Sequence, residues 1–334
     1  MSIYSIQPAT FGSLRTYPLA SRKSKVTAKD LGRRFTGNTS IATFLRTLPN
    51  ILAARDLQEL VHRIRLARKR KSAILWGMGG HFIKVGLAPI LVELMEKGFV
   101  SAVAMNGAAL IHDFEIAMAG STSEDVDVSL GKGQFGMAKE TGWGINEIAK
   151  LAHRIRIGYG EAAGQYLTSG IVEPKNPDLS ILIAAYKRRI PVTVHIAIGT
   201  DIPHIHPAAD GAALGAASYH DFRLFCALVQ QMDGGGAYLN WGSAVLLPEI
   251  FLKAVSVARN LGNPLQAITT ANFDFIQHYR PTTNVLKRPI SASNQTRRET
   301  SRGFAITGHH ELLFPLFAAA LLAPATTRRK QPNR

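Results

Sequence analysis

The sequence of 334 residues contains a single cysteine, Cys226, which excludes a disulfide within the chain. Cys226 lies in an apolar run with helical spacing, so we expect a buried structural thiol. The chain also lacks any run of 18 apolar residues, and residues 1–30 lack the apolar core of a signal peptide. We therefore expect a cytoplasmic protein with no membrane partner.

Acidic residues are scarce as well, because 23 Asp and Glu stand against 39 Lys and Arg, for a net charge of +16. Such a balance is typical of proteins that meet nucleic acid, an acidic membrane surface or an anionic ligand. The basic segments, however, carry no interleaved aromatic residues on which bases could stack. We expect nonspecific attraction to phosphate but no specific nucleic-acid partner. The main basic segments are 63–71, 154–156, 187–189, 287–302 and 328–334.

The G-x-G-x-x-G spacing of many dinucleotide sites is absent too, but residues 72–120 contain two glycine turns. One apolar run ends in Gly79 and Gly80, and a second ends at Asn106 and Gly107. Helical spacing follows each turn, which indicates strand, turn and helix twice in succession. Only glycine lets backbone N–H groups and a helix N-terminus approach a phosphate closely, so this unit predicts a cofactor site. Such turns also occur in proteins that bind no ligand there.

The remaining chain continues the alternation of strands and helices. Apolar runs predict strands at 192–198, 237–240 and 267–271, and residues 304–322 are typical of a strand, a polar turn and a terminal helix. This alternation predicts an α/β fold with a doubly wound, mostly parallel sheet.

Three regions are expected along the chain. Residues 1–50 form an N-terminal helical arm with a helix at 38–48, and we expect the arm to lie across another surface, as in an oligomer contact. Residues 51–323 form the ligand-binding domain, which opens with a helix at 52–70. Residues 324–334 form a basic, disordered tail.

Glycine is concentrated between Ser121 and a helix predicted from Ile145. The glycines there are Gly131, Gly133, Gly136 and Gly142. This density indicates either a mobile active-site loop or an ordinary surface connection.

Histidines gather after the strand at 192–198. His204 and His206 alternate, so on an extended chain both imidazoles would share one face, with His195 upstream. Such a pair can bind zinc, but hydrogen bonding or substrate contact is the favoured reading, and we predict no metal. Asp210 and Gly211 form a turn that opens the next helix, which is predicted over residues 219–232, and an acid at this turn can accept hydrogen bonds from ribose hydroxyls.

Six segments, in order, resemble motifs of the deoxyhypusine synthase family, in particular its bacterial deoxyhypusine synthase-like branch. They are GHFIKVG (80–86), MNGAALIHD (105–113), ADGAALGA (209–216), GSAVLLPE (242–249), TTAN (269–272) and HHELLFPL (309–316). The resemblance spans residues 72–322 and implies a Rossmann-like, NAD-binding fold. The implied cofactor-binding residues are Gly79, Gly80, His81, Asn106, Gly107, Ala108, Asp113, Asp210, Gly211, Gly242, Ser243, Thr270 and Ala271.

The chain departs from the family at its catalytic groups. The family's catalytic lysine lies in Ser-Trp-Gly-Lys shortly after an Arg-Pro, whereas here Arg280-Pro281 is followed by TTNVLKRP and Lys287 lies two places early. Most of the family's acids are also replaced, for example by Ala216 and Thr283. A polyamine needs several carboxylates in place of its hydration, so we expect a natural substrate other than spermidine.

Basic and imidazole side chains take the place of these acids. Lys84 or Lys287 can form an imine with a carbonyl if its pKa is depressed, or can simply pair with a phosphate or a carboxylate. His112 or His309 can act as a general base near pH 7, or can be a hydrogen-bonded structural residue. The expected substrate-contacting residues are His195, His204, His206, Asp274, His278 and Glu249.

The resemblance therefore implies an NAD-dependent transferase that abstracts a hydride from an amine or alcohol substrate and leaves an imine or a carbonyl. In the family, an aminobutyl group then passes from spermidine to a lysine of an acceptor protein, and the subunits form a homotetramer. Two alternatives stay open. One is a non-catalytic NAD-binding or scaffold protein, and the other is a metal-dependent hydrolase built on His204 and His206.

Overall fold

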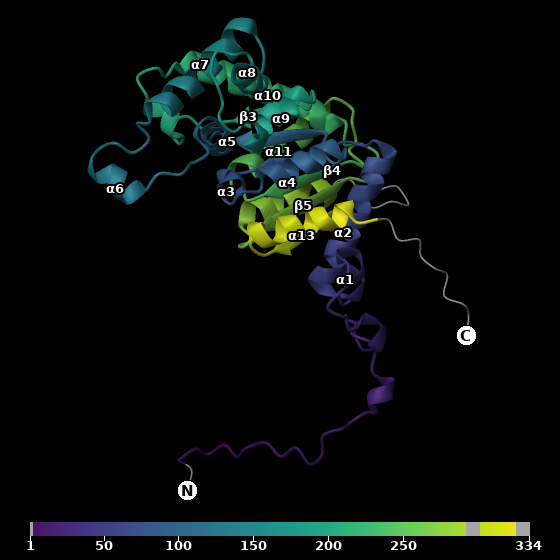
Figure 1. The fold of residues 1–334 in the computed structure, drawn as a ribbon. Helices are drawn as coiled ribbons and strands as arrows, with labels where there is room; N and C mark the ends of the chain where they lie inside the picture. Colours follow the sequence, from purple (N-terminus) through teal and green to yellow (C-terminus); the bar gives the residue numbers. More distant parts are fainter. Residues whose placement is uncertain (1–2, 292–300, 325–334) are drawn as a thin grey trace.

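A computed structural model describes residues 3–291 and 301–324, and its centre is a parallel sheet of six strands (Figure 1). The strands are β1 (Ile74–Met78), β2 (Ala102–Asn106), β3 (Val192–His195), β4 (Ala237–Trp241), β5 (Thr269–Asp274) and β6 (Arg302–Thr307). Their order in the sheet is β3-β2-β1-β4-β5-β6, and every neighbouring pair is parallel. The predicted α/β, Rossmann-like fold is confirmed.

Helices connect the strands and lie on both sides of the sheet (Figure 1). They are α1 (Ile41–Thr47), α2 (Leu52–Arg70), α3 (Gly80–Lys84), α4 (Ala88–Glu96), α5 (Gly107–Ala119), α6 (Val126–Gly131), α7 (Lys139–Ile155), α8 (Tyr159–Thr168), α9 (Ile181–Lys187), α10 (Gly211–Gln230), α11 (Leu246–Asn260), α12 (Arg288–Ser291) and α13 (His310–Leu322). Shorter turns are η1 (Leu19–Ser21), η2 (Ala28–Asp30), η3 (Pro177–Leu179), η4 (Ile202–Ile205) and the π-helical η5 (Pro281–Lys287).

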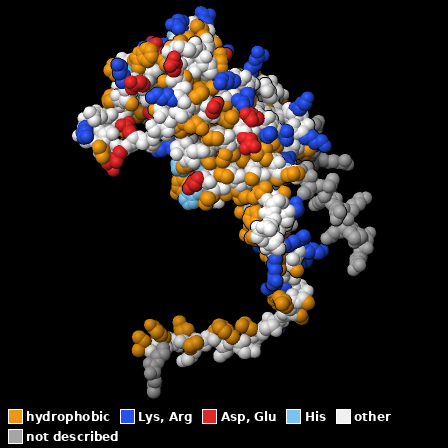
Figure 2. Space-filling model, viewed as in Figure 1, with side chains coloured by type: hydrophobic (Ala, Val, Ile, Leu, Met, Phe, Trp, Pro, Cys, Tyr) orange, Lys and Arg blue, Asp and Glu red, His pale blue; other side chains and the backbone are white. Residues whose placement is uncertain are grey.

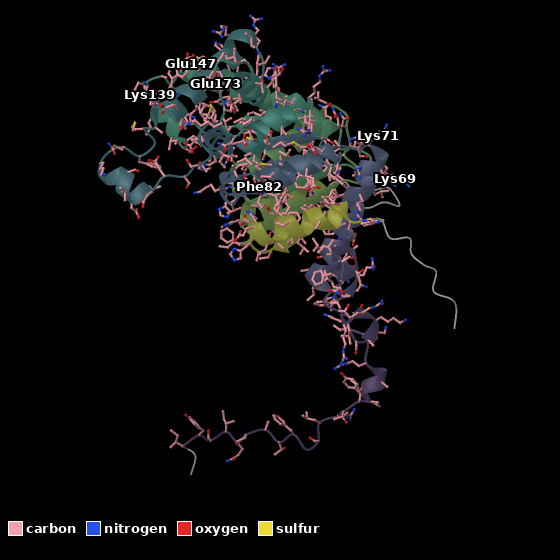
Figure 3. All side chains as sticks on the ribbon, in the orientation of Figure 1. Lys69, Lys71, Phe82, Lys139, Glu147 and Glu173 are labelled. Carbon is pink, nitrogen blue, oxygen red and sulfur yellow. The ribbon has the colours of Figure 1, made fainter. Side chains whose placement is uncertain are left out.

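The two faces of the sheet carry separate apolar cores, because successive side chains of a strand point to opposite faces. Trp76 and Trp241 point to the face covered by α2, α3, α4, α5 and α13. Phe82 of α3 joins this core against Trp241 and Phe314 (Figure 3). Tyr238 points to the other face, where α10 and α11 pack and where Cys226 is buried as predicted.

The connections reverse direction at the centre of the sheet. The chain builds outward from β1 to β2 and β3 on one side, crosses back through α10, and builds outward from β4 to β5 and β6 on the other. In such sheets the crevice between the two central strands, at their carboxyl ends, is where ligands bind. Here that position is the carboxyl edge of β1 and β4.

Three local predictions are wrong. The glycine-rich segment is not a loop up to Ile145, because α7 begins at Lys139 and two of its glycines allow close contacts, Gly142 with His206 and Gly144 with Phe114. Strand β3 ends at His195, three residues before the predicted end, and His204 lies in η4 rather than on an extended chain. Helix α10 already begins at Gly211, directly after the N-cap Asp210.

The N-terminal arm extends away from the body of the molecule (Figure 1). Residues 3–29 and 31–35 are exposed, and hydrophobic side chains follow one another along the arm, as Figure 2 shows. The largest exposed ones are Ile3, Tyr4, Ile6, Phe11, Leu14, Tyr17, Leu19, Leu31 and Phe35. Within the described residues no helix is both long and apolar enough to cross a membrane. Apart from Pro324, the predicted disordered tail lies outside the described residues.

Candidate active site at the carboxyl edge of the sheet

Two glycine turns meet at the carboxyl ends of β1 and β4. The backbone N–H of Gly79 donates to the carbonyl oxygen of Trp241 (3.0 Å), and a Cβ atom on Gly79 would lie 2.5 Å from the carbonyl oxygen of Gly242. Gly242 has a φ of +65°, and a Cβ there would lie 2.5 Å from Cε1 of His310. Side chains at these positions would force the strands or the histidine apart, so both turns require glycine.

His310, at the first turn of α13, is the buried titratable group beside these two turns. Its Nε2 lies 3.1 Å from the carbonyl oxygen of Phe273, which can only accept, so Nε2 carries the proton and Nδ1 has a free lone pair. Nδ1 is buried and has no hydrogen-bond partner among the described residues. Burial lowers the pKa of His310, which keeps the imidazole neutral near pH 7.

Exposed rings surround His310 at the surface. The ring of His81 lies 5.4 Å from that of His310, and Phe275 stacks on His309 with 6.1 Å between the ring centroids. Figure 2 shows histidine side chains, in pale blue, at the surface near the start of α13. Lys84 is exposed one turn after His81 on α3, so the two side chains share a helix face.

The neighbouring turn, between β2 and α5, packs directly on this group. A Cβ on Gly80 would lie 2.9 Å from Cβ of Ala108 and 3.1 Å from Cδ2 of His112. His112 is held in place, because its Nδ1 lies 2.6 Å from Oγ1 of Thr122, which itself donates to Glu115. Burial alone would raise the pKa of Glu115, but the nearby His112 imidazole and the hydrogen bonds from Thr122 and Thr141 lower it. His112 is thus part of a fixed polar network.

Asp201 covers the N-terminus of α5. Its carboxylate occupies the space that a Cβ on Gly107 would fill, and Oδ2 is buried with no hydrogen-bond partner in the described part of the chain. Burial raises the pKa of Asp201 to about 6. The N-terminus of a helix attracts anions through its free N–H groups and its dipole. Asp201 therefore stands where an anionic group of a ligand would bind.

Asp113, predicted beside the cofactor, lies on the buried face of α5 instead of at the edge. It is fully buried and accepts hydrogen bonds from Oγ of Ser180 (2.5 Å) and the N–H groups of Ile181 (2.7 Å) and Leu182 (3.2 Å). Burial raises its pKa to about 6, against the effect of these bonds. In this position Asp113 holds the N-terminus of α9.

Several other predicted residues also lie in the interior. Thr270 and Ala271 are buried in β5, before its carboxyl end. His195 is buried on the face of α10, where its Nε2 lies 3.0 Å from Oγ1 of Thr193 and its ring meets Phe225 edge-on. Burial lowers the pKa of His195 to about 3, so the ring is neutral.

The residues of the segment 199–211 have separate neighbours. Nδ1 of His204 accepts from the N–H of Gly199 (3.1 Å), whereas His206 packs over Gly142 of α7. The carboxylate of Asp210 accepts from the first N–H groups of α10, and Gly211 has open space around it. In the described ranges, no group of three or more His, Cys, Asp or Glu side chains is placed to hold a metal ion.

A further polar group lies at the ends of β4 and β5, toward α11 and η5. Nδ2 of Asn240 donates to Oδ1 of Asn272 (2.7 Å) and to the carbonyl oxygen of Ser243 (2.9 Å). Asp274 is buried at the end of β5. Glu249 pairs with Lys253 and Arg280 and accepts from Asn284. Lys287 and His278 are exposed on and before η5.

Two residues of this edge, His310 and Asp201, were not among the predicted site residues. His310 has a sequence signal, since it follows the turn after β6 directly beside the predicted His309. Asp201 has none, because its contact with Gly107 joins positions far apart in the chain.

No protein-family model and no curated protein matches the chain. Among solved structures, a conserved putative LOR/SDH protein from Methanococcus maripaludis S2 is 16% identical, with a TM-score of 0.49 over 81% of this chain and 70% of that one. A putative deoxyhypusine synthase from Entamoeba histolytica is 10% identical, with a TM-score of 0.48 over 86% of this chain and 95% of that one.

The arginine dihydrolase ArgZ of cyanobacteria is 17% identical, with a TM-score of 0.47 over 81% of this chain. The chain spans 33% of the length of ArgZ. Likenesses at this level do not distinguish one function from another.

Proposed function

We propose that the chain is an NAD-dependent enzyme of the deoxyhypusine synthase-like type, which oxidises a carbon bearing an amine or a hydroxyl group. The observation that carries the proposal is the carboxyl edge of β1 and β4, where glycine turns from both strands meet a buried, neutral imidazole. This is the position in a doubly wound sheet at which dinucleotides bind. The ordered resemblance of six segments to the family supports the same cofactor.

The polar groups of the edge fit a dinucleotide. Asn106 and Gly107 stand at the N-terminus of α5, which suits a phosphate once the Asp201 carboxylate moves aside. Gly211, with open space around it, and the carboxylate of Asp210 stand at the N-terminus of α10 and suit the sugar hydroxyls. When bound, NAD would supply the acceptor for a hydride from the substrate carbon.

His310 would hold the proton released in this step. As the carbon loses its hydride, the hydroxyl or amino group loses a proton, and the free lone pair on Nδ1 accepts it. The bond from Nε2 to the carbonyl oxygen of Phe273 keeps the ring in the tautomer that leaves Nδ1 free. The ring next to His310 is that of His81, which is exposed and can change rotamer within nanoseconds as a substrate approaches.

The remaining predicted groups take secondary roles in this proposal. Lys84 lies beside His81 and is the lysine best placed to meet a carbonyl or imine product, whereas Lys287 lies on η5. His309 and His112 flank the crevice. The same proposal includes a lysine of an acceptor protein. It also includes a homotetramer, whose subunits are joined through the exposed apolar arm. Sedimentation of the full chain would test the tetramer.

The carboxyl edge of the sheet favours a substrate other than spermidine. Of its carboxylates, Asp274 is buried, and Glu249 is already paired with two cations. A polycation would meet few free acids here. The test is to mix the protein with NAD and a panel of amines and alcohols, spermidine included, and to follow the absorbance of reduced nicotinamide. Reduction of NAD with a monoamine or an alcohol supports the proposal, and no reduction of NAD with any compound of the panel would contradict it.

A further inference from the structure

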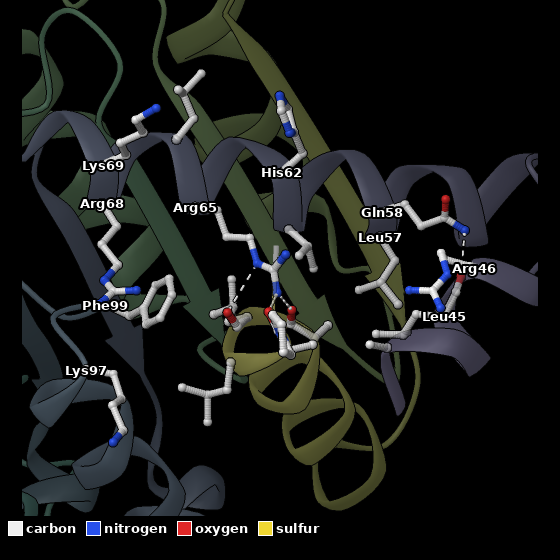
Figure 4. Close-up of a pocket in the computed structure, with 18 of the residues that line it drawn as sticks. Leu45, Arg46, Leu57, Gln58, His62, Arg65, Arg68, Lys69, Lys97 and Phe99 are labelled. Atoms are coloured by element: carbon white, nitrogen blue, oxygen red, sulfur yellow. Dashed lines mark hydrogen bonds between the residues drawn. The ribbon is translucent and has the colours of Figure 1, made fainter. Parts of the chain in front are cut away.

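A hollow lies at the opposite edge of the sheet from the candidate active site. It is a groove of about 1400 Å³ between α1, α2, the end of α4 and the end of α13. Its place at the amino edge follows from the chain, because α2 ends just before β1 and Phe99 precedes β2. The lining residues follow α2 from Leu57 to Lys69 (Figure 4). We call it the α2 groove.

The α2 groove has an apolar floor. Leu57 and Val61 of α2, Leu45 of α1, and Leu321 and Leu322 of α13 contribute to it. Leu57, Leu321 and Phe99 are buried, so the floor is continuous with the core beneath it.

One arginine of the groove, Arg65, stabilises the fold. Arg65 donates from Nη2 to the carbonyl oxygen of Ala320 (2.6 Å) and from Nε to that of Leu321 (3.2 Å), and it also reaches the carbonyl oxygen of Ala323 (Figure 4). These are the last carbonyls of α13, which have no partner within the helix. Arg65 thus fixes the end of α13 against α2 and gives the groove a firm wall.

The other cations of the groove are not neutralised. They are Arg46, Arg68, Lys69 and Lys97. None of the four forms an ion pair within the described residues, whereas the acids of α2, Asp56 and Glu59, are already paired with arginines outside the groove. The guanidinium of Arg68 lies over the ring of Phe99, with Cζ 4.5 Å from the ring centroid. Glu93 is the one acid among the lining residues.

The chain's own termini carry the wrong charge to fill the groove. The arm contains Arg15, Arg22, Lys23, Lys25, Lys29, Arg33 and Arg34 against a single acid, Asp30. The C-terminal residues that follow the groove contain Arg328, Arg329, Lys330 and Arg334 and no acid. Like charges repel at close range, which argues against either terminus of this or a second copy. A bare polyanion would leave the apolar floor unused.

We propose that the α2 groove docks an acidic amphipathic helix of another protein. Its apolar face would cover the leucines of the floor, and its carboxylates would meet the rim at Arg68, Lys69 and Lys97. This is the helix-in-groove mode of recognition. The stretch of α2 from Leu57 to Lys69 is roughly 18 Å long at 1.5 Å per residue, which matches a partner helix of about three turns.

The test uses the full chain and a labelled peptide of about four turns, with leucines on one face and glutamates on the other. We expect saturable binding by fluorescence anisotropy that weakens as salt is added. The double variant Arg68→Glu/Lys69→Glu should lose about tenfold or more in affinity, because two attractive contacts become repulsive. A peptide of the same composition in scrambled order should bind about tenfold more weakly, since its leucines no longer share a face.

The matched control is Lys132→Glu/Lys139→Glu, which changes the net charge equally on α6 and α7, distant from the groove (Figure 3 labels Lys69 and Lys139). If it weakens binding as much as the groove variant, the attraction is nonspecific and the proposal is wrong. If vesicles of phosphatidylglycerol bind through Arg68 and Lys69 while the peptide does not, the surface is a membrane contact and the proposal is again wrong.

A second measurement does not depend on variants that fold. Hydrogen exchange of the wild-type chain with the peptide should slow at α2 and at the end of α13. Slowing confined to the carboxyl edge, or none, would contradict docking in the groove.

Discussion

At the scale of single residues, the proposed enzymatic function depends on His310. We predict that His310→Gln lowers turnover with NAD and a substrate amine or alcohol by about 10²- to 10⁴-fold, the usual contribution of a general base. Glutamine keeps a donor for the carbonyl of Phe273 but has no basic nitrogen. The matched control is His309→Gln, which changes the adjacent, exposed histidine and should leave turnover within a few fold. Equal losses in both variants would contradict the assignment.

The pH dependence of turnover follows from the same residue. Burial lowers the pKa of His310 below its ordinary value of 6.5, so the unprotonated base persists as the pH falls toward that value. We predict that kcat/KM stays level between pH 8 and 6.5 and falls only at lower pH. A fall that begins above pH 6.5 would indicate a base in a less buried position.

Asp201 is predicted to oppose the cofactor. Its pKa of about 6 makes it an anion above that pH, where it stands at the N-terminus of α5. Asp201→Asn removes this charge and should tighten NAD binding at pH 8 by about fivefold, equivalent to about 1 kcal/mol of charge interaction at a helix end. The gain should shrink below pH 6, where the wild-type carboxyl is protonated. Weaker binding of the variant would show instead that Asp201 accepts hydrogen bonds from the ligand.

At the scale of elements, the turns of β1 and β4 are locked together by glycine. Gly79→Ala places a Cβ 2.5 Å from the carbonyl oxygen of Gly242, so we predict a loss of about 1–3 kcal/mol in the free energy of unfolding, as for other overpacked sites. Chemical denaturation measures it. Gly211→Ala is the control, since nothing lies near its Cβ and alanine favours the helix by about 1 kcal/mol. Equal effects would mean that the turns are not in contact.

The strands were predictable from the sequence because each is a short apolar run between turn residues. The doubly wound order also followed, since alternation of strands and helices favours parallel pairing. The starts of helices were harder to predict, because glycines are typical of loops. In α7, however, Gly142 and Gly144 provide room for His206 and Phe114. The 3-10 turn that carries His204 depends on its local capping by Asp201.

The candidate site was predictable only in part. The turns at Gly79, Asn106 and Gly242 do lie together at one edge, as parallel strands require. The burial that makes His310 a neutral base depends on its contact with Gly242, which no local pattern records. The same holds for His195 and Asp113, whose positions in the interior depend on the packing of α10 and α9.

At the scale of the whole molecule, the two edges of the sheet differ in chemistry. The carboxyl edge gathers histidines, most of them beside glycine turns, whereas the amino edge carries unpaired cations over an apolar floor. The excess positive charge of the chain therefore has different effects at the two edges of the sheet. Loss of binding at one edge need not affect the other, so the cofactor and the docking proposals can fail separately.

The most direct test of the central claim is calorimetric titration of the full chain with NAD. We predict saturable binding of one NAD per chain, with an affinity that rises in Asp201→Asn and is unchanged in Arg68→Glu/Lys69→Glu. No heat of binding up to millimolar NAD, in the wild type and in Asp201→Asn alike, would contradict the claim that the carboxyl edge of β1 and β4 is a dinucleotide site.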